Sequence, residues 1–250
     1  MQTEILKKHI ADLMRASDAR GRYTYTDFLS LAEQSDALNV IRAAKETRYT
    51  MYGGSQMSER RIIIFGAADE IGYPFDIPVK VIEIMPRSEK FGEELSHRDY
   101  LGAVLNLGIE RKLTGDIIVK GKRAWLFCME QIAELICSEL TRVRHTDVTC
   151  RIAEGEIPEL LPKFEELSLN VAAERIDAMT AALLNKSRTA AAELIKSQQV
   201  YINGAAVLDT SRTLKEGDVI SIRHFGKYIY DGMSGRTKKG RYYAAVRKYV

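Results

Sequence analysis

The stretch NKSRTAAAELIKSQQVYINGAAV, residues 185–207, contains a helix and a hairpin with almost no spacer between them. Ser187 is a natural N-cap for a short Ala-rich helix, because its hydroxyl can accept a hydrogen bond from an unpaired amide of the first turn. Asn203 and Gly204 suit the two positive-φ positions of a type I′ turn between short strands. The stretch therefore predicts a helix that runs directly into a small sheet.

Cations surround the start of the predicted helix, where Lys186 and Arg188 flank Ser187. The first amide groups of a helix have no partner within the helix and point outward with the positive end of the dipole, so anions bind there. A cation at this end of a helix is unfavourable because it opposes the dipole, so the presence of Arg188 here is not explained by helix stability. We expect Arg188 to bind phosphate, whereas Lys196 at the other helix end is equally typical of a solvated charge.

A helix over 170–185, with Asn170 as its cap, and a strand over 219–223 complete the module on either side. A single tight turn separates the two helices, which predicts an angular helix pair braced by a small sheet. Asp177 is expected to orient Arg175 or to cap a local turn. The residues expected to extend the phosphate track are Arg175, Lys196, Arg223 and Lys227.

The segment 228–249, YIYDGMSGRTKKGRYYAAVRKY, interleaves cations with tyrosines. This mixture suits RNA, which it would contact by phosphate pairing and base stacking. The alternation of RYYAAVRKY equally suits a final strand, in which half of the tyrosines would belong to the core. The candidate RNA-binding residues in this segment are Arg236, Lys238, Lys239 and Arg241.

The charge of the chain is unevenly distributed along its 250 residues. Residues 171–250 hold 14 Lys and Arg against 7 Asp and Glu, a net charge of +7. The remaining 170 residues hold 23 against 27, a net charge of −4. A basic C-terminal third on a mildly acidic body indicates a module that binds a polyanion.

The middle of the chain has a β-α-β-β-α-β order, with strands expected over 79–86 and 147–153 at its ends. This order is that of the ferredoxin-like fold, which RNA-recognition motifs share, although no aromatic RNP-like octamer is present. Trp125 and Phe127 alternate with Leu126, so one face of the sheet could stack bases; core packing is the commoner role of such residues. Topology alone assigns no function.

The whole chain is therefore expected to be an α+β protein. We predict a helical N-terminal domain over 1–75, a ferredoxin-like (RRM-like) domain over 76–154, a linker over 155–169 and a C-terminal domain of two helices and a small sheet over 170–250. The linker is expected from two prolines and several acids in GEIPELLPKFEELSL.

The C-terminal module resembles the S4 RNA-binding domain in the order and spacing of several elements over about 55 residues. The elements are Arg175-x-Asp177, Ser187-Arg188, Ala191 to Ile195, Val200-x-Ile202-Asn203-Gly204, and Gly217-Asp218-x-Ile220-Ser221-Ile222-Arg223. The family usually has Gly before the Val-x-Ile-Asn-Gly strand, where this chain has Gln198-Gln199. The helix-to-strand turn therefore departs from the family pattern.

Most of the chain resembles the YlmH family of bacterial S4 proteins. The motifs that carry this resemblance are MYGGSQMSERRIIIFG (51–66), LSHRDYLGAVLNLGIERKLTGDIIV (95–119) and TKKGR (237–241). The resemblance implies a non-catalytic RNA-binding factor that associates with the large ribosomal subunit and tRNA. It also implies a role in ribosome-associated quality control, in which the protein would hold a peptidyl-tRNA while the stalled chain is extended or processed.

The tripeptide His97-Arg98-Asp99 also occurs in kinase catalytic loops, but the Gly-rich loop, the Val-Ala-Ile-Lys strand and the Asp-Phe-Gly of kinases are missing from the sequence. Asp99 would complement a helix dipole, and His97 and Arg98 are candidate RNA contacts of the middle domain. Structural capping is at least as good an explanation.

No catalytic residue, metal site, cofactor or small-molecule substrate is expected. The histidines, at positions 9, 97, 145 and 224, are isolated, and the three cysteines form no Cys-x-x-Cys and are expected to be buried free thiols. No apolar run approaches the roughly 18 residues of a membrane span, and a cytoplasmic protein is expected. Two alternatives stay open: an RNA-modifying enzyme of the pseudouridine synthase or methyltransferase class, and a protein–protein adaptor that binds through its N-terminal helices.

Overall fold

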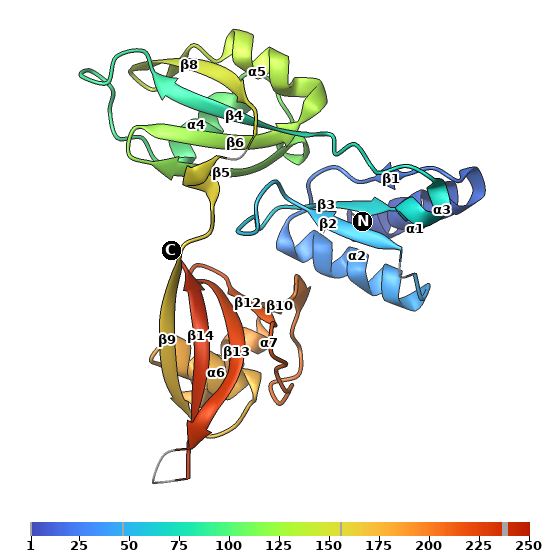
Figure 1. Ribbon diagram of the computed structural model, residues 1–250, viewed down its shortest axis with the longest axis vertical. Helices are drawn as coiled ribbons and strands as arrows, with labels where there is room; N and C mark the ends of the chain where they lie inside the picture. The colour runs from blue at the N-terminus through green and yellow to red at the C-terminus, as the bar shows by residue number, and fades with distance from the viewer. Residues whose placement is uncertain (1, 47, 156, 237–239) are drawn as a thin grey trace. The chain divides into compact units, whose positions relative to one another are not determined.

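The structure is a computed structural model that describes residues 2–46, 48–155, 157–236 and 240–250 (Figure 1). The chain divides into two compact units, Met1–Leu161 and Pro162–Val250. The first unit holds both the N-terminal helical region and the middle domain, and their division at residue 75 stays a prediction. Each unit is described by itself.

The N-terminal part of the first unit packs two helices against a small antiparallel sheet of order β1-β3-β2. Helix α2 begins after Ser30, whose amide and hydroxyl both donate to Glu33 at 2.7 Å, and Glu33 N donates back to the Ser30 hydroxyl in a capping box. The bounds are α1 (Gln2–Arg20), β1 (Thr24–Tyr25), α2 (Leu31–Ala43), β2 (Tyr49–Tyr52), β3 (Ile62–Phe65) and α3 (Ala68–Ile71). The helices α1 and α2 agree with the predicted helical N-terminal region, and the structure adds a small sheet to it.

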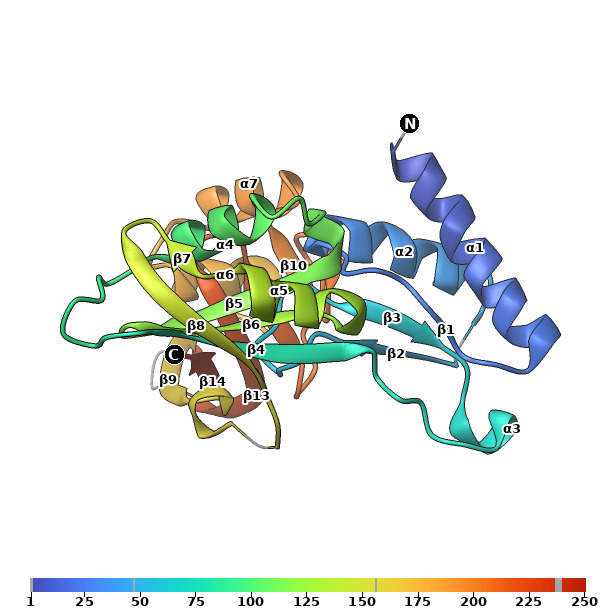
Figure 2. The ribbon, with the colours of Figure 1, turned by 90° about the horizontal axis from the view of Figure 1, so that it is seen from above.

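The middle part confirms the ferredoxin-like arrangement, with neighbouring strands antiparallel in the order β5-β6-β4-β8-β7. Figure 2 shows α4 and α5 on the same face of this sheet. The bounds are β4 (Val79–Pro86), α4 (His97–Leu105), β5 (Thr114–Lys120), β6 (Arg123–Met129), α5 (Ala133–Glu139), β7 (Arg142–Val143) and β8 (Thr146–Ala153). Short 3-10 turns are η1 (Arg111–Leu113), η2 (Glu130–Ile132) and η3 (Pro158–Leu160).

The helix-covered face of the sheet forms the core of the middle part. Ile82, Ile84 and Leu126 are fully buried there against Tyr100 and Val104 of α4 and against α5. The free thiols belong to the same core: Cys128 is buried and the other two cysteines are half-buried. Burial raises the pKa of Cys128 to about 12, so this thiol is unreactive near neutral pH.

On the opposite face of the sheet, part of the surface is covered by the N-terminal part. Phe127 is fully buried among Phe28, Ile62 and Ile64. A Cβ at Gly54, where φ is +94°, would lie 2.0 Å from the Phe127 ring, so only glycine fits the loop that covers this ring. Phe127 is therefore a core residue and is not available to stack bases.

The second unit is a six-stranded antiparallel sheet of order β11-β10-β12-β13-β14-β9 with two helices packed on it. Figure 1 shows α6 and α7 on one face of the sheet. The bounds are β9 (Phe164–Val171), α6 (Ile176–Leu183), α7 (Arg188–Lys196), β10 (Val200–Ile202), β11 (Ala205–Ala206), β12 (Val219–Ile222), β13 (Gly226–Arg236) and β14 (Tyr242–Tyr249).

Two predictions about this unit are wrong in detail. Residues 164–169, expected in a linker, belong to strand β9, which pairs with β14 from Val171↔Tyr242 to Phe164↔Tyr249. Because Asn170 also lies in β9, it does not cap a helix, and α6 begins only at Ile176 after the extended Arg175. The strand reading of the final segment is confirmed by β14.

Within the described ranges, no helix combines the length with the apolar composition that crossing a bilayer requires.

Candidate nucleic-acid interface

The two arginines predicted around α6 and α7 converge on one carboxylate. Arg175 donates to Asp177 through Nε (3.2 Å to Oδ1) and Nη2 (3.0 Å to Oδ2), and Arg188 Nη2 lies 2.8 Å from the same Oδ2. The amide of Ala178 donates to Oδ1 at 2.8 Å. We call Arg175, Asp177 and Arg188 the Asp177 cluster; it shows Asp177 orienting Arg175, as predicted.

The Asp177 cluster presents positive charge to solvent. The Asp177 side chain is only 9% exposed, whereas those of Arg175 and Arg188 are 41% and 53% exposed. The Asp177 carboxylate accepts four hydrogen bonds, three of them from the two guanidinium groups, and these bonds hold both guanidinium groups in place. Fixed, half-exposed guanidinium groups are suited to bind phosphate oxygens.

The start of α7 lies beside this cluster. Ser187 is the N-cap, and its hydroxyl accepts a hydrogen bond from Ala190 N at 3.2 Å, which confirms the predicted cap. Lys186 is exposed, and its Nζ lies 5.9 Å from the ring centre of Phe225, a half-exposed aromatic that the sequence did not single out. Only the fold reveals this neighbour, because 39 positions separate the two residues in the chain.

Two further predicted residues lie away from the start of α7. Lys196 is the exposed last residue of the nine-residue helix, about 12 Å along the axis from Arg188. Arg223 is exposed in the loop after β12, and its backbone amide donates to Gln199 O at 2.9 Å. The same loop carries Phe225, the aromatic neighbour of Lys186. This loop therefore contacts the chain both just after α7, at Gln199, and just before it, at Lys186.

Lys227 does not fit the expected track. It lies on β13 and is only 8% exposed, with its Nζ 5.3 Å from the ring centre of Tyr249 on β14. Packing against this ring encloses the side chain that was expected to extend the phosphate track. The prediction for Lys227 is therefore corrected to a mainly buried position.

The cations of the β13–β14 hairpin are held locally. Arg236 donates from Nη2 to the Tyr242 hydroxyl at 2.8 Å and its guanidinium lies 4.8 Å from that ring centre. Arg241 Nη2 donates to Asn170 O at 3.1 Å. Both side chains are exposed, and a role for them in RNA binding stays a prediction. Lys238 and Lys239 lie outside the described residues.

The middle-domain candidates lie at the start of α4. Ser96 donates to Asp99 from its amide (2.8 Å) and its hydroxyl (2.6 Å), so Asp99 is a capping residue. His97 and Arg98 are exposed. Partial burial of the ring lowers the pKa of His97, and Arg111 lowers it further, so the imidazole is mainly neutral at pH 7. A neutral His97 is a weaker partner for phosphate than Arg98 beside it.

Arg111 belongs to a pair of arginines that serve the fold. Arg60 donates to the carbonyls of Phe28 and Thr114 at 2.8 and 3.0 Å, and Arg111 donates to Thr114 O at 2.7 Å. The Arg60 guanidinium thus joins the N-terminal part to β5 through the Thr114 carbonyl, whereas Arg111 holds η1 against β5 within the middle part. In the part of the chain that the structure describes, no three His, Cys, Asp or Glu side chains come together as metal ligands.

Known families and proteins match this architecture. Residues 75–156 match a family model described as "Putative RNA-binding domain in YlmH", and residues 174–220 match the S4 domain. The chain is 26% identical over 224 residues to "Ribosome-associated protein quality control protein P2" of Bacillus subtilis (strain 168), covering 88% of this chain and 85% of the relative. A solved structure, "Cell division protein ylmH from Streptococcus pneumoniae", is 20% identical with a TM-score of 0.47, covering 62% of this chain and 92% of that one.

The fold and the two family-model matches define the class of protein: a ferredoxin-like domain, whose family model is described as a putative RNA-binding domain, precedes an S4 domain in one chain. The chain belongs to the YlmH family of S4-domain proteins.

Proposed function

We propose that the protein is a non-catalytic, cytoplasmic RNA-binding factor that associates with tRNA and the large ribosomal subunit. Its task would be the quality control of stalled peptidyl-tRNA. The Asp177 cluster carries this proposal, because it fixes two half-exposed guanidinium groups beside the N-terminus of α7. Such a surface binds the RNA backbone without a reaction to perform.

The relative from Bacillus subtilis supports the ribosomal part of the proposal through its name, a ribosome-associated quality control protein. The charge of the C-terminal third supports an RNA partner, since 14 cations face 7 acids in residues 171–250. The family matches support a binding role in place of a catalytic one, because both matched domains are binding modules.

A salt titration tests the proposal. Affinity for tRNA and for 23S-type ribosomal RNA would be measured over a series of salt concentrations for the wild type and Arg188→Ala. Loss of one phosphate contact is expected to reduce the slope of log K against log salt by about 0.7 to 0.9. Arg247→Ala is the matched control, because Arg247 is an arginine of β14 in the same unit that pairs with Asp231 of β13 at 2.8 Å.

Two results would count against the proposal. If Arg188→Ala leaves both slope and affinity unchanged, Arg188 does not contact RNA. If mass spectrometry of RNA incubated with the protein, with and without a methyl donor, finds a modified nucleoside, the protein is an RNA-modifying enzyme.

A further inference from the structure

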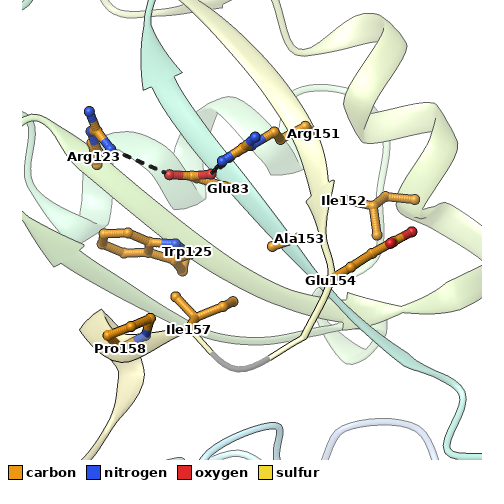
Figure 3. A pocket seen from close by; sticks show the side chains of 9 residues that line it. All are labelled: Glu83, Arg123, Trp125, Arg151, Ile152, Ala153, Glu154, Ile157 and Pro158. Carbon is orange, nitrogen blue, oxygen red and sulfur yellow. Dashed lines mark hydrogen bonds and ion pairs between the residues drawn. The ribbon is translucent and has the colours of Figure 1, made fainter.

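A pocket of about 460 Å³ lies on the middle-domain sheet, on the face opposite α4 and α5 (Figure 3). Its floor is formed by Glu83 of β4, whose direct cross-strand neighbours are Trp125 of β6 and Arg151 of β8. Side chains alternate between the faces of a strand, so these residues point away from the core residues Ile82 and Ile84. The volume is within the range of small-ligand sites.

The pocket contains a buried carboxylate with spare hydrogen-bonding capacity. The Glu83 side chain is 7% exposed, and Arg151 donates to its Oε2 from Nε at 2.7 Å and from Nη2 at 2.6 Å. Arg123 Nη1 lies 3.8 Å from Oε1, which is too far for a hydrogen bond. We call these three residues the Glu83 cluster; in it, one carboxylate oxygen remains a free acceptor toward the described residues.

Trp125 supplies a matching donor. The residue is only 2% exposed, and no hydrogen bond joins its indole to the other residues drawn in Figure 3. Buried indole N–H groups usually find a partner, and the indole can only donate. Toward the described residues, the Trp125 indole donates no hydrogen bond and Glu83 Oε1 accepts none, although Arg123 lies 3.8 Å from Oε1. The two groups lie side by side because the residues are paired across β4 and β6.

We infer that this pocket binds an unpaired base of single-stranded RNA. The edge of every RNA base carries acceptors that the indole N–H can reach and donors that Glu83 Oε1 can accept. Ile157 and Pro158 provide an apolar wall for the base. Arg123 and Arg151, whose side chains are 45% and 66% exposed, lie at the rim, where a flanking phosphate would meet them.

This inference rests on the proposed function only in taking RNA as the ligand, and it uses none of the residues of the second unit. It adds a second binding site, which reads a base, to the phosphate-binding surface of α7. A base in the pocket would become tethered at a fixed point, whereas phosphate contacts allow a strand to slide.

Fluorescence of the full chain tests the inference directly, because Trp125 is its only tryptophan. Titration with a single-stranded RNA of about 10 nucleotides is expected to change the Trp125 emission with saturation. Glu83→Gln should weaken this binding roughly tenfold, because a carboxylate acceptor is lost. Arg123→Ala, at the rim, should weaken it less and keeps the test valid if Glu83→Gln fails to fold, as judged by circular dichroism.

Arg142→Ala is the matched control, since Arg142 is an exposed arginine of β7 that lies 3.9 Å from Asp147 and does not line the pocket. Its titration should match the wild type. Ribose 5-phosphate is the second probe and should leave the emission unchanged, because it carries no base; an equal change with this sugar phosphate would overturn the inference.

A constant Trp125 emission with single-stranded RNA, while labelled tRNA still binds by anisotropy, would overturn this inference and leave the proposed function intact. If tRNA binding is lost but the Trp125 emission still changes with single-stranded RNA, the proposed function is overturned and this inference stands. The two proposals can therefore fail separately.

Discussion

The Asp177 cluster and the Glu83 cluster have the same composition, two arginines around one nearly buried carboxylate, but they differ in how the carboxylate is used. In the first, both oxygens of Asp177 are occupied by two arginines and an amide. In the second, Oε2 of Glu83 takes both donors of Arg151 and Oε1 receives no hydrogen bond from Arg123. The first cluster is saturated, and the second is not.

This difference matters because a saturated carboxylate can only hold its arginines, whereas an unsaturated one can still accept a ligand. The supports also differ: Arg188 begins a helix, where the dipole favours anions, and Glu83 lies in the middle of a sheet beside an aromatic wall. The same three ionic groups thus suit phosphate in one place and a base edge in the other.

The strongest test of this contrast removes both arginines of the saturated cluster. Arg175→Ala/Arg188→Ala is expected to weaken tRNA binding about 100-fold at low salt, since each charged hydrogen bond contributes about 1.5 kcal/mol. The Trp125 emission change should persist. Arg247→Ala/Lys248→Ala removes two cations from β14, both paired with acids, and serves as the control. An equal loss in the control would show that only net charge matters.

Removal of Asp177, the acid that Arg175 and Arg188 share, separates the effect of arginine positioning from the effect of net charge. Asp177→Ala raises the net charge by one, yet we expect RNA affinity to fall about tenfold and the free energy of unfolding to fall by roughly 2 kcal/mol, because two arginines and the Ala178 amide lose their acceptor. Urea denaturation and anisotropy measure the two effects. Tighter RNA binding by this variant would contradict the positioning role of Asp177.

The cap of α7 offers a smaller perturbation of the same cluster. Ser187→Ala removes the acceptor of the Ala190 amide and should lower the free energy of unfolding by about 1 kcal/mol. RNA affinity should fall only a few-fold, because Arg188 keeps its bond to Asp177. Ser187→Asp, which preserves the cap, should restore stability in urea denaturation; failure to do so would argue against the capping role.

The cap of α4 has one arginine on its acid, Arg144 at 3.3 Å, where Asp177 has two, and it gives the smallest effect. Hydrogen bonds from the hydroxyl and the amide of Ser96 lower the pKa of Asp99 below its ordinary value of 3.8. An acid with a lowered folded-state pKa stabilises the fold above its unfolded-state pKa, and this contribution is lost as the pH falls through the folded-state value. The difference in unfolding free energy between wild type and Asp99→Asn should therefore be largest near neutral pH and shrink below about pH 4. A difference that grows in acid would contradict this assignment.

Local signals were sufficient to predict several elements of the fold. Ser187 as the cap of α7, the succession of strands and helices along the middle domain, and the neighbourhood of Arg175 and Asp177 all depend on residues close in sequence, where caps and hydrophobic periods act. These elements agree with the structure, although α6 begins six residues later than expected.

Pairings between distant segments were not predictable in this way. Strand β9 looks like a linker because prolines precede it and its partner β14 lies more than 70 residues away. Glu83 and Arg151 are 68 residues apart, and only the strand order brings them together. Lys227 was misjudged for the same reason, since Tyr249 covers it from the neighbouring strand.

The position of β14 between β13 and β9 has a consequence for folding during synthesis of the protein. Among the six strands of this sheet, β14 is translated last, and β9 is translated first and must wait for it. The sheet that supports α6 and α7 can therefore close only after the ribosome has delivered residues 242–249. Until then β9 has no hydrogen-bonded neighbour in this sheet, so the support of α6 and α7 is incomplete during synthesis.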